Sequence, residues 1–150
     1  MILTRRTALI LGLSALGLAG CGGRHHKAEE PAGPAEINRK IAYWSDRLDV
    51  PESLLHRVVS RESGYNPAAR NGPYYGLMQI LPATAKTMGY DGPASGLLDA
   101  DTNLHYGGLY LRGAWIVAGH NQDRAIMWYS KGYYYEAKRK GLLEETGLKR

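Results

Sequence analysis

The most constraining feature of the sequence is an apolar helix pattern that stops abruptly. Leu54, Leu55, Val58 and Val59 recur at intervals of one, three and four residues, which is typical of one face of an α-helix. A glycine at position 64 and an Asn-Pro pair at positions 66–67 follow directly, and these residue types end helices. The pattern therefore predicts a helix that ends close to residue 62.

Glu62 lies on the apolar side of this predicted helix, four residues after Val58 and seven after Leu55. Partial burial disfavours the charged carboxylate, and so does the partial negative charge at a helix C-terminus. Both effects raise the pKa, and a carboxyl with a raised pKa can act as a general acid near neutral pH. The alternative is a helix-end glutamate that simply reaches water.

The remaining apolar residues also recur at helical spacing, and the sequence shows no strand pattern of any length. Helices are predicted from about Ile37 to Leu48, over Pro82–Met88, from about Thr102 to Gly119, after Asp123, and over Tyr133–Lys140. The sequence therefore predicts an all-α, mainly helical domain, with at most a small hairpin between Arg70 and Tyr75.

Three acidic positions are predicted to cap helices. Asp49 precedes the helix that ends near Glu62, either Asp99 or Asp101 precedes the long helix, and Asp123 precedes the next. The polar tail, residues 141–150, is expected to fray.

The first twenty residues predict an export signal. Arg5 and Arg6 precede an apolar run, Ala8–Leu18, which is shorter than the roughly 20 residues that a membrane-spanning helix needs. The run ends in Leu-Ala-Gly followed by Cys21, the single cysteine of the chain, and this resembles a bacterial lipobox. A plain secretory signal with an incidental cysteine is the alternative, and the export route, general or twin-arginine, stays open.

The lipobox implies a division into three parts: a signal peptide over residues 1–20, a lipidated Cys21 with a Gly- and Pro-rich linker over residues 21–36, and a catalytic domain over residues 37–150. Gly22, rather than an aspartate, follows the cysteine, which resembles sorting to the outer membrane. The expected location is the periplasmic face of the outer membrane, with the inner membrane as the alternative.

Two motifs carry a family resemblance: Glu-Ser-Gly-Tyr-Asn-Pro at residues 62–67 and Gly-Leu-Met-Gln-Ile-Leu-Pro at residues 76–82. Together they resemble the catalytic domain of the lytic transglycosylases of the soluble, goose-type lysozyme-like family. Tyr129 matches the tyrosine of the family's Ala-Tyr-Asn motif, but Ser130 replaces its asparagine. Gly-Pro-Tyr-Tyr at residues 72–75 replaces the Gly-Ala that usually precedes the second motif.

The resemblance implies a small lysozyme-like fold and cleavage of the β-1,4 bond between N-acetylmuramic acid and N-acetylglucosamine, with 1,6-anhydromuramic ends. Glu62 would be the single acid and base, and no metal or cofactor would be needed. Substrate-binding residues would be Ser63, Met78, Gln79 and Tyr129, although Met78 could equally be a core residue. Asn103, in a further matching segment, is interpreted as a helix cap.

The expected partners are peptidoglycan glycan strands and, through Cys21, a membrane. The net charge of +5 suits an anionic wall polymer. The sequence lacks the basic stripe with interleaved aromatic residues that is typical of nucleic-acid binding, so nucleic acid is not an expected partner. A monomer is expected. Two other functions stay open. One is a lysozyme-like hydrolase with a base among Asp91, Asp99 and Asp101; the other is a non-catalytic wall-binding lipoprotein, suggested by Ser130.

Overall fold

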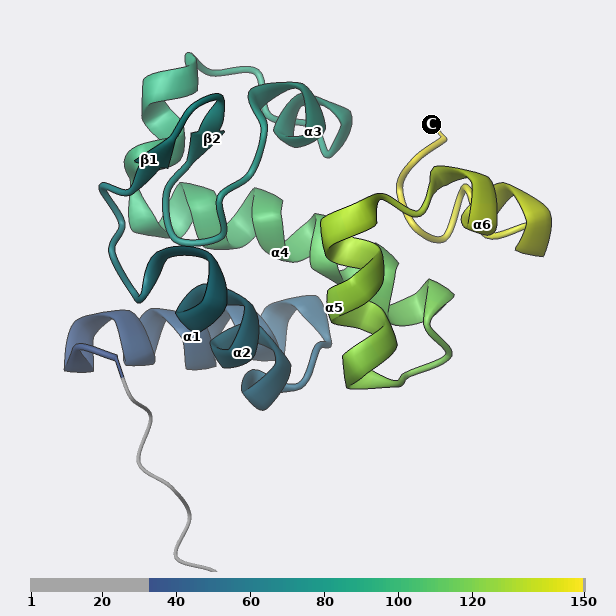
Figure 1. The fold of residues 1–150 in the computed structure, drawn as a ribbon, viewed down its shortest axis with the longest axis horizontal. Helices are drawn as coiled ribbons and strands as arrows, with labels where there is room; N and C mark the ends of the chain where they lie inside the picture. Colours follow the sequence, from purple (N-terminus) through teal and green to yellow (C-terminus); the bar gives the residue numbers. More distant parts are fainter. Residues whose placement is uncertain (1–32, 150) are drawn as a thin grey trace, which may run out of the picture.

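A computed structural model describes residues 33–149, and these form six α-helices, one short 3-10 helix and one hairpin (Figure 1). In chain order they are α1 (Ala35–Leu48), α2 (Glu52–Ser63), β1 (Arg70–Asn71), β2 (Tyr74–Tyr75), α3 (Pro82–Thr87), η1 (Ala94–Leu98), α4 (Ala100–Val117), α5 (Gln122–Lys131) and α6 (Tyr134–Lys140). The two strands pair antiparallel, with Arg70 opposite Tyr75. The prediction of a mainly helical domain with one minor hairpin is confirmed.

Helix α4 is the central element, because α1, α3, α5, α6 and η1 all contact it. Helices α1 and α2 lie on one side of α4, while the hairpin, η1 and α3 lie on the other (Figure 1). Gly107 and Gly108 allow this close packing inside α4. A β-carbon at Gly107 would lie 2.8 Å from the Sδ of Met78, and one at Gly108 would meet the side chain of Leu48.

The main hydrophobic core lies between α1, α2, α4 and the segment after the hairpin. Its fully buried members include Ile41, Leu54, Leu55, Val58, Val59, Leu77, Met78, Leu104 and Leu111. The apolar stripe that predicted α2 therefore faces this core. Helix α2 contacts α1 and α5, so its position is set by both of these helices.

The C-terminal tail differs from the prediction. Leu142, Leu143 and Leu148 pack against a second buried cluster that includes Val117 and Tyr133, and only 4% of Thr146 is exposed. The expectation of a frayed tail is wrong up to residue 149, because these three leucines have an apolar surface to cover.

Two of the predicted caps are also wrong. Asp49 ends α1 in a left-handed conformation (φ 52°), and α2 instead begins after Pro51 with no side-chain cap. Asn121, not Asp123, caps α5 by accepting a hydrogen bond from the backbone N–H of Arg124. The prediction is confirmed for Asp99, which caps α4. Helix α1 starts two residues before the expected Ile37, at Ala35.

The predicted signal peptide, the lipidation site at Cys21 and most of the predicted linker lie outside the described residues. Of the helices between residues 33 and 149, none combines the length and apolar character that a membrane crossing requires.

Candidate active site

A cleft of about 370 Å³ opens where the last turn of α2 meets the hairpin and the C-terminal half of α5. Seven residues line it: Arg61, Glu62, Asn71, Tyr74, Gln79, Tyr129 and Ser130. They come from four separate segments of the chain. The cleft therefore exists only once α2, the hairpin, the following loop and α5 have packed around α4.

Glu62 is the one acidic residue of this lining, and its side chain is 24% exposed. Burial raises the pKa of its carboxyl above the ordinary 4.5, and the charge of Arg61, whose Nε lies 3.8 Å from the carboxylate, partly opposes that rise. Among the described residues, no group donates a hydrogen bond to the carboxyl. A carboxyl with a raised pKa and no hydrogen-bond donor is suited to giving a proton to a ligand.

Tyr129, from α5, lies near Glu62 and lines the cleft. Its hydroxyl donates a 2.8 Å hydrogen bond to the backbone carbonyl of Met78. Burial, together with the negative charge of Glu62, places the pKa of the Tyr129 hydroxyl well above its usual value. The hydroxyl therefore stays protonated and remains a donor throughout the physiological pH range.

Gln79 belongs to the cleft, but its amide also supports the loop before α3. Its Nε2 donates to the carbonyls of Gly76 (2.9 Å) and Ala69 (3.2 Å), and its backbone is left-handed (φ 47°). Both amide hydrogens are thus used inside the loop. The amide oxygen is the group that Gln79 can offer to a ligand in the cleft.

The structure places Met78 and Ser63 away from the lining of the cleft. The side chain of Met78 is fully buried in the core, which agrees with the core alternative and not with direct contact to a ligand. The Ser63 hydroxyl donates to the carbonyl of Val59 (3.2 Å) within α2. For both residues the observed role is structural: Met78 anchors the loop, and Ser63 closes the helix.

Asn103 is a residue that supports the cleft from behind and whose place the sequence interpretation missed. It is not a helix cap but a fully buried side chain. Its Oδ1 accepts from the backbone N–H of Met78 (2.8 Å), and its Nδ2 donates to the carbonyls of Tyr75 (2.8 Å) and Leu97 (2.7 Å). The sequence held a signal for it, since Asn103 shares the spacing of the buried residues Leu104, Gly107 and Leu111.

Arg61, Asn71, Tyr74 and Ser130 also line the cleft without having been predicted as site residues. Ser130, at the position where the matched motif has asparagine, is exposed and donates its hydroxyl to the carbonyl of Ile126 (3.1 Å). Tyr74 is 41% exposed. The two departures from the family motifs, at positions 72–75 and at Ser130, were the available signal for Tyr74 and Ser130.

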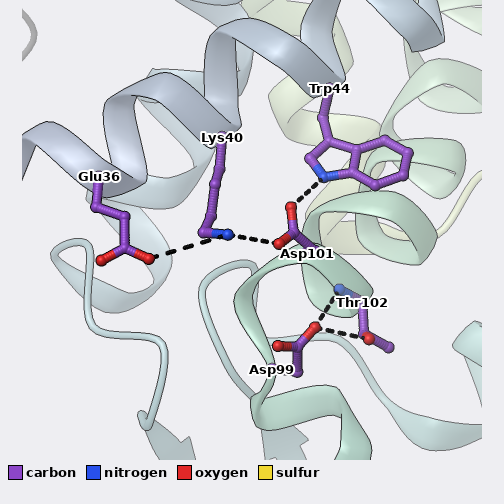
Figure 2. Close-up of polar contacts among 6 residues, drawn as sticks. All are labelled: Glu36, Lys40, Trp44, Asp99, Asp101 and Thr102. Carbon is purple, nitrogen blue, oxygen red and sulfur yellow. Dashed lines mark hydrogen bonds and ion pairs between the residues drawn. The ribbon is translucent and has the colours of Figure 1, made fainter.

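The other acidic candidates are engaged elsewhere (Figure 2). Asp99 accepts hydrogen bonds of 2.8 Å from the backbone N–H and the hydroxyl of Thr102. Asp101 pairs with Lys40 and accepts from the Nε1 of Trp44 (2.9 Å), and these hydrogen bonds hold the pKa of its carboxyl below the ordinary value. Neither residue lines the cleft.

Asp91 is exposed and does not line the cleft either. Over residues 33–149, no three histidine, cysteine, aspartate or glutamate side chains come together as a metal site would require. Within the described part of the chain, the chemistry available in this cleft is therefore that of a single carboxyl with a raised pKa.

Comparison with known proteins gives one family and several relatives. Residues 39–144 match the Transglycosylase SLT domain, and this span includes every residue that lines the cleft. The chain is 29% identical over 107 residues to the soluble lytic murein transglycosylase of Escherichia coli (strain K12), and equally to that of Salmonella typhimurium (strain LT2). Each match covers 66% of this chain but only 16% of the relative's length. No solved structure matches the chain significantly.

Proposed function

This chain belongs to the transglycosylase SLT domain family, and from that premise we propose that it is a peptidoglycan lytic transglycosylase in which Glu62 is both the acid and the base. The substrate would be the β-1,4 bond between N-acetylmuramic acid and N-acetylglucosamine. The observation that carries the proposal is Glu62 itself, a partly buried carboxyl with a raised pKa in a cleft whose lining holds no second acid.

In the first step, protonated Glu62 gives its proton to the glycosidic oxygen, and the bond from that oxygen to the anomeric carbon breaks. The 2-acetamido group of the substrate stabilises the positive charge that develops at the anomeric carbon. In the second step, the Glu62 carboxylate takes the proton of the muramic acid 6-hydroxyl, whose oxygen attacks the anomeric carbon. A 1,6-anhydro ring forms, Glu62 is protonated again, and no water is consumed.

The surroundings of Glu62 favour this use of one group in two steps. Burial favours the protonated form that the first step requires, while Arg61 at 3.8 Å limits the rise of the pKa so that the carboxylate is accessible for the second step. Tyr129 lies close enough for its own pKa to respond to the charge of Glu62. Its hydrogen bond to the carbonyl of Met78 ties α5 to the loop that carries Gln79.

The test is the product formed by wild type and by Glu62→Gln from purified peptidoglycan. Wild type is expected to release ends lighter by one water than reducing ends. Because acid–base assistance is worth about 10²–10⁴-fold, the variant should retain activity only near the detection limit. Glu52→Gln, at the other end of α2, is the matched control and should keep full turnover. Full activity of Glu62→Gln would refute the assignment.

The hydrolase remains the alternative on the same fold, and product mass separates the two, since a hydrolase releases reducing ends. The structure offers this alternative little support, because Asp99 and Asp101 are bound in other contacts. If the wild-type protein binds peptidoglycan but releases no products from it, the hypothesis of a non-catalytic wall-binding protein is favoured instead.

For the N-terminal part, we infer from the lipobox that Cys21 is lipidated and that the catalytic domain is held at the periplasmic face of the outer membrane. Two or three acyl chains would give the stable anchoring that one chain does not. Residues 21–36 would then serve as the tether between lipid and domain.

A further inference from the structure

The cleft continues beyond Glu62 into a second hollow of about 220 Å³. The two hollows share Tyr74, Gln79, Tyr129 and Ser130, so they form one groove. The far half, as we call the second hollow, adds Ile80, Leu81, Thr84, Tyr110, Lys131 and Gly132. A chain of sugars that places its scissile bond at Glu62 would extend a neighbouring unit into the far half.

The far half has an apolar wall and a single charged side chain. Ile80, Leu81 and the ring of Tyr110 form the wall, which suits the apolar face of a sugar or the methyl of an acetamido group. Lys131, the last residue of α5, is the only charged residue of this lining. No carboxylate of the far half neutralises it.

Lys131 is also uncompensated by the acids outside the groove. Glu136, the next acid along the chain, pairs with Arg139 (2.6 Å) and with Lys140 (3.4 Å). Among residues 33–149, no ion pair includes Lys131. By contrast, Arg61 in the near half already faces the Glu62 carboxylate at 3.8 Å. Lys131 is therefore the charged side chain of the groove that has no ion-pair partner among residues 33–149.

We propose that the far half is a carboxylate-recognising subsite in which Lys131 pairs with an acidic group carried by the glycan. The proposal rests on the function given above and adds a specificity-determining residue to the same groove: Lys131 strengthens the binding of strands that carry a carboxylate in the far half. Peptidoglycan offers such a group in two places, on the lactyl ether of muramic acid where no peptide is attached, and on the stem peptide where one is. The chemistry at Lys131 is the same for both.

The binding experiment uses the full chain carrying Glu62→Gln, so that no probe is consumed, and compares Lys131→Met with Lys131→Arg. Lys138→Met is the matched control, because it removes the same charge from an exposed position of α6 outside the groove. Calorimetry measures affinity for three probes: soluble glycan strands with stem peptides, the same strands after amidase treatment, and an N-acetylglucosamine oligomer.

Lys131→Met is expected to weaken binding of carboxylate-bearing strands about three- to fivefold, the size of an exposed ion pair, and to leave the neutral oligomer unaffected. The loss should shrink at high salt, and Lys131→Arg should restore affinity. A loss confined to amidase-treated strands identifies the lactyl carboxylate, and one confined to peptide-bearing strands identifies the peptide.

Equal affinity of Lys131→Met and its parent for both kinds of strand would overturn the proposal. So would an equal loss for all three probes, or the same loss in Lys138→Met. Failure of the proposed function gives a different result, because wild-type Glu62 protein would then release no 1,6-anhydro ends from peptidoglycan, whatever the affinities are.

Discussion

The hydroxyl of Tyr129 donates a 2.8 Å hydrogen bond to the backbone carbonyl of Met78. The backbone N–H of Met78 in turn donates to the Oδ1 of Asn103, also at 2.8 Å. One residue of the loop is thus held from α5 on one side and from α4 on the other. Since Gln79 follows Met78 directly, this arrangement fixes the loop that lines the cleft opposite Glu62.

Tyr129→Phe is expected to keep the fold but lower turnover. The ring stays in place, the lost hydrogen bond costs about 1 kcal/mol of unfolding free energy, and the loop is released from α5. Thermal unfolding and steady-state kinetics measure the two effects. Tyr133→Phe is the control, because it removes a 2.8 Å bond to the carbonyl of Tyr110 away from Glu62. Equal turnover in wild type and Tyr129→Phe would reduce Tyr129 to packing.

Glu62→Gln is expected to raise stability at neutral pH but not in acid. The raised pKa means that the folded state resists ionisation of Glu62. The stability this group contributes is therefore full below its unfolded pKa and is lost as pH rises through the folded value. Melting temperatures of both proteins should converge below the unfolded pKa of Glu62, diverge as the pH rises through the raised folded value, and differ by a constant amount above it. A constant difference at every pH would contradict the assigned direction.

Glu136→Gln should show the opposite pH dependence. Hydrogen bonds from Arg139 chiefly lower the pKa of the Glu136 carboxyl to about 2. A lowered pKa contributes stability above the unfolded value, and this contribution is lost as pH falls through the folded value. The variant should thus be less stable than wild type at neutral pH and equal to it near pH 2. The same melting experiment provides the measurement.

Asp99 and Asp101 should be dispensable for turnover. Asp99→Ala removes the cap of α4 and should cost about 1 kcal/mol of stability, while Asp101→Asn weakens the contact with Lys40 (Figure 2). Neither change reaches the cleft, so kcat should match wild type. A large loss of kcat in Asp101→Asn, with reducing ends among the products, would support the two-acid hydrolase.

Alanine at Gly107 and at Gly108 should separate stability from catalysis. Both replacements improve helix propensity by about 1 kcal/mol, but both overfill the core. At Gly107 the new β-carbon lies 2.8 Å from Sδ and 3.0 Å from Cβ of Met78, whereas at Gly108 it meets Leu48 in α1. We expect lower melting temperatures in both variants and lower kcat only in Gly107→Ala. Equal kcat values would show that Met78 does not transmit strain to the cleft.

Local sequence determined much of the fold. Residues three and four apart share a helix face whatever the rest of the chain does, so the apolar stripe of α2 and the place of Glu62 on it could be predicted. Gly64 and the Asn-Pro pair at 66–67 act on the chain immediately around them, which is why the end of α2, at Ser63, was predictable within a residue. The hairpin at residues 70–75 was found for the same reason.

Tertiary structure decided what these elements do together. Asn103 and Met78 are 25 residues apart, yet the fold buries both side chains and joins the Asn103 amide to the backbone N–H of Met78. Lys131 lines the groove without an ion-pair partner among residues 33–149, while Glu136, five residues on, pairs with Arg139 and Lys140. Such contacts depend on which surfaces meet after α4 is enclosed, and no spacing along the chain specifies them. The sequence determined the helices and the place of Glu62 on its helix, whereas the packing around α4 decided which side chains surround Glu62.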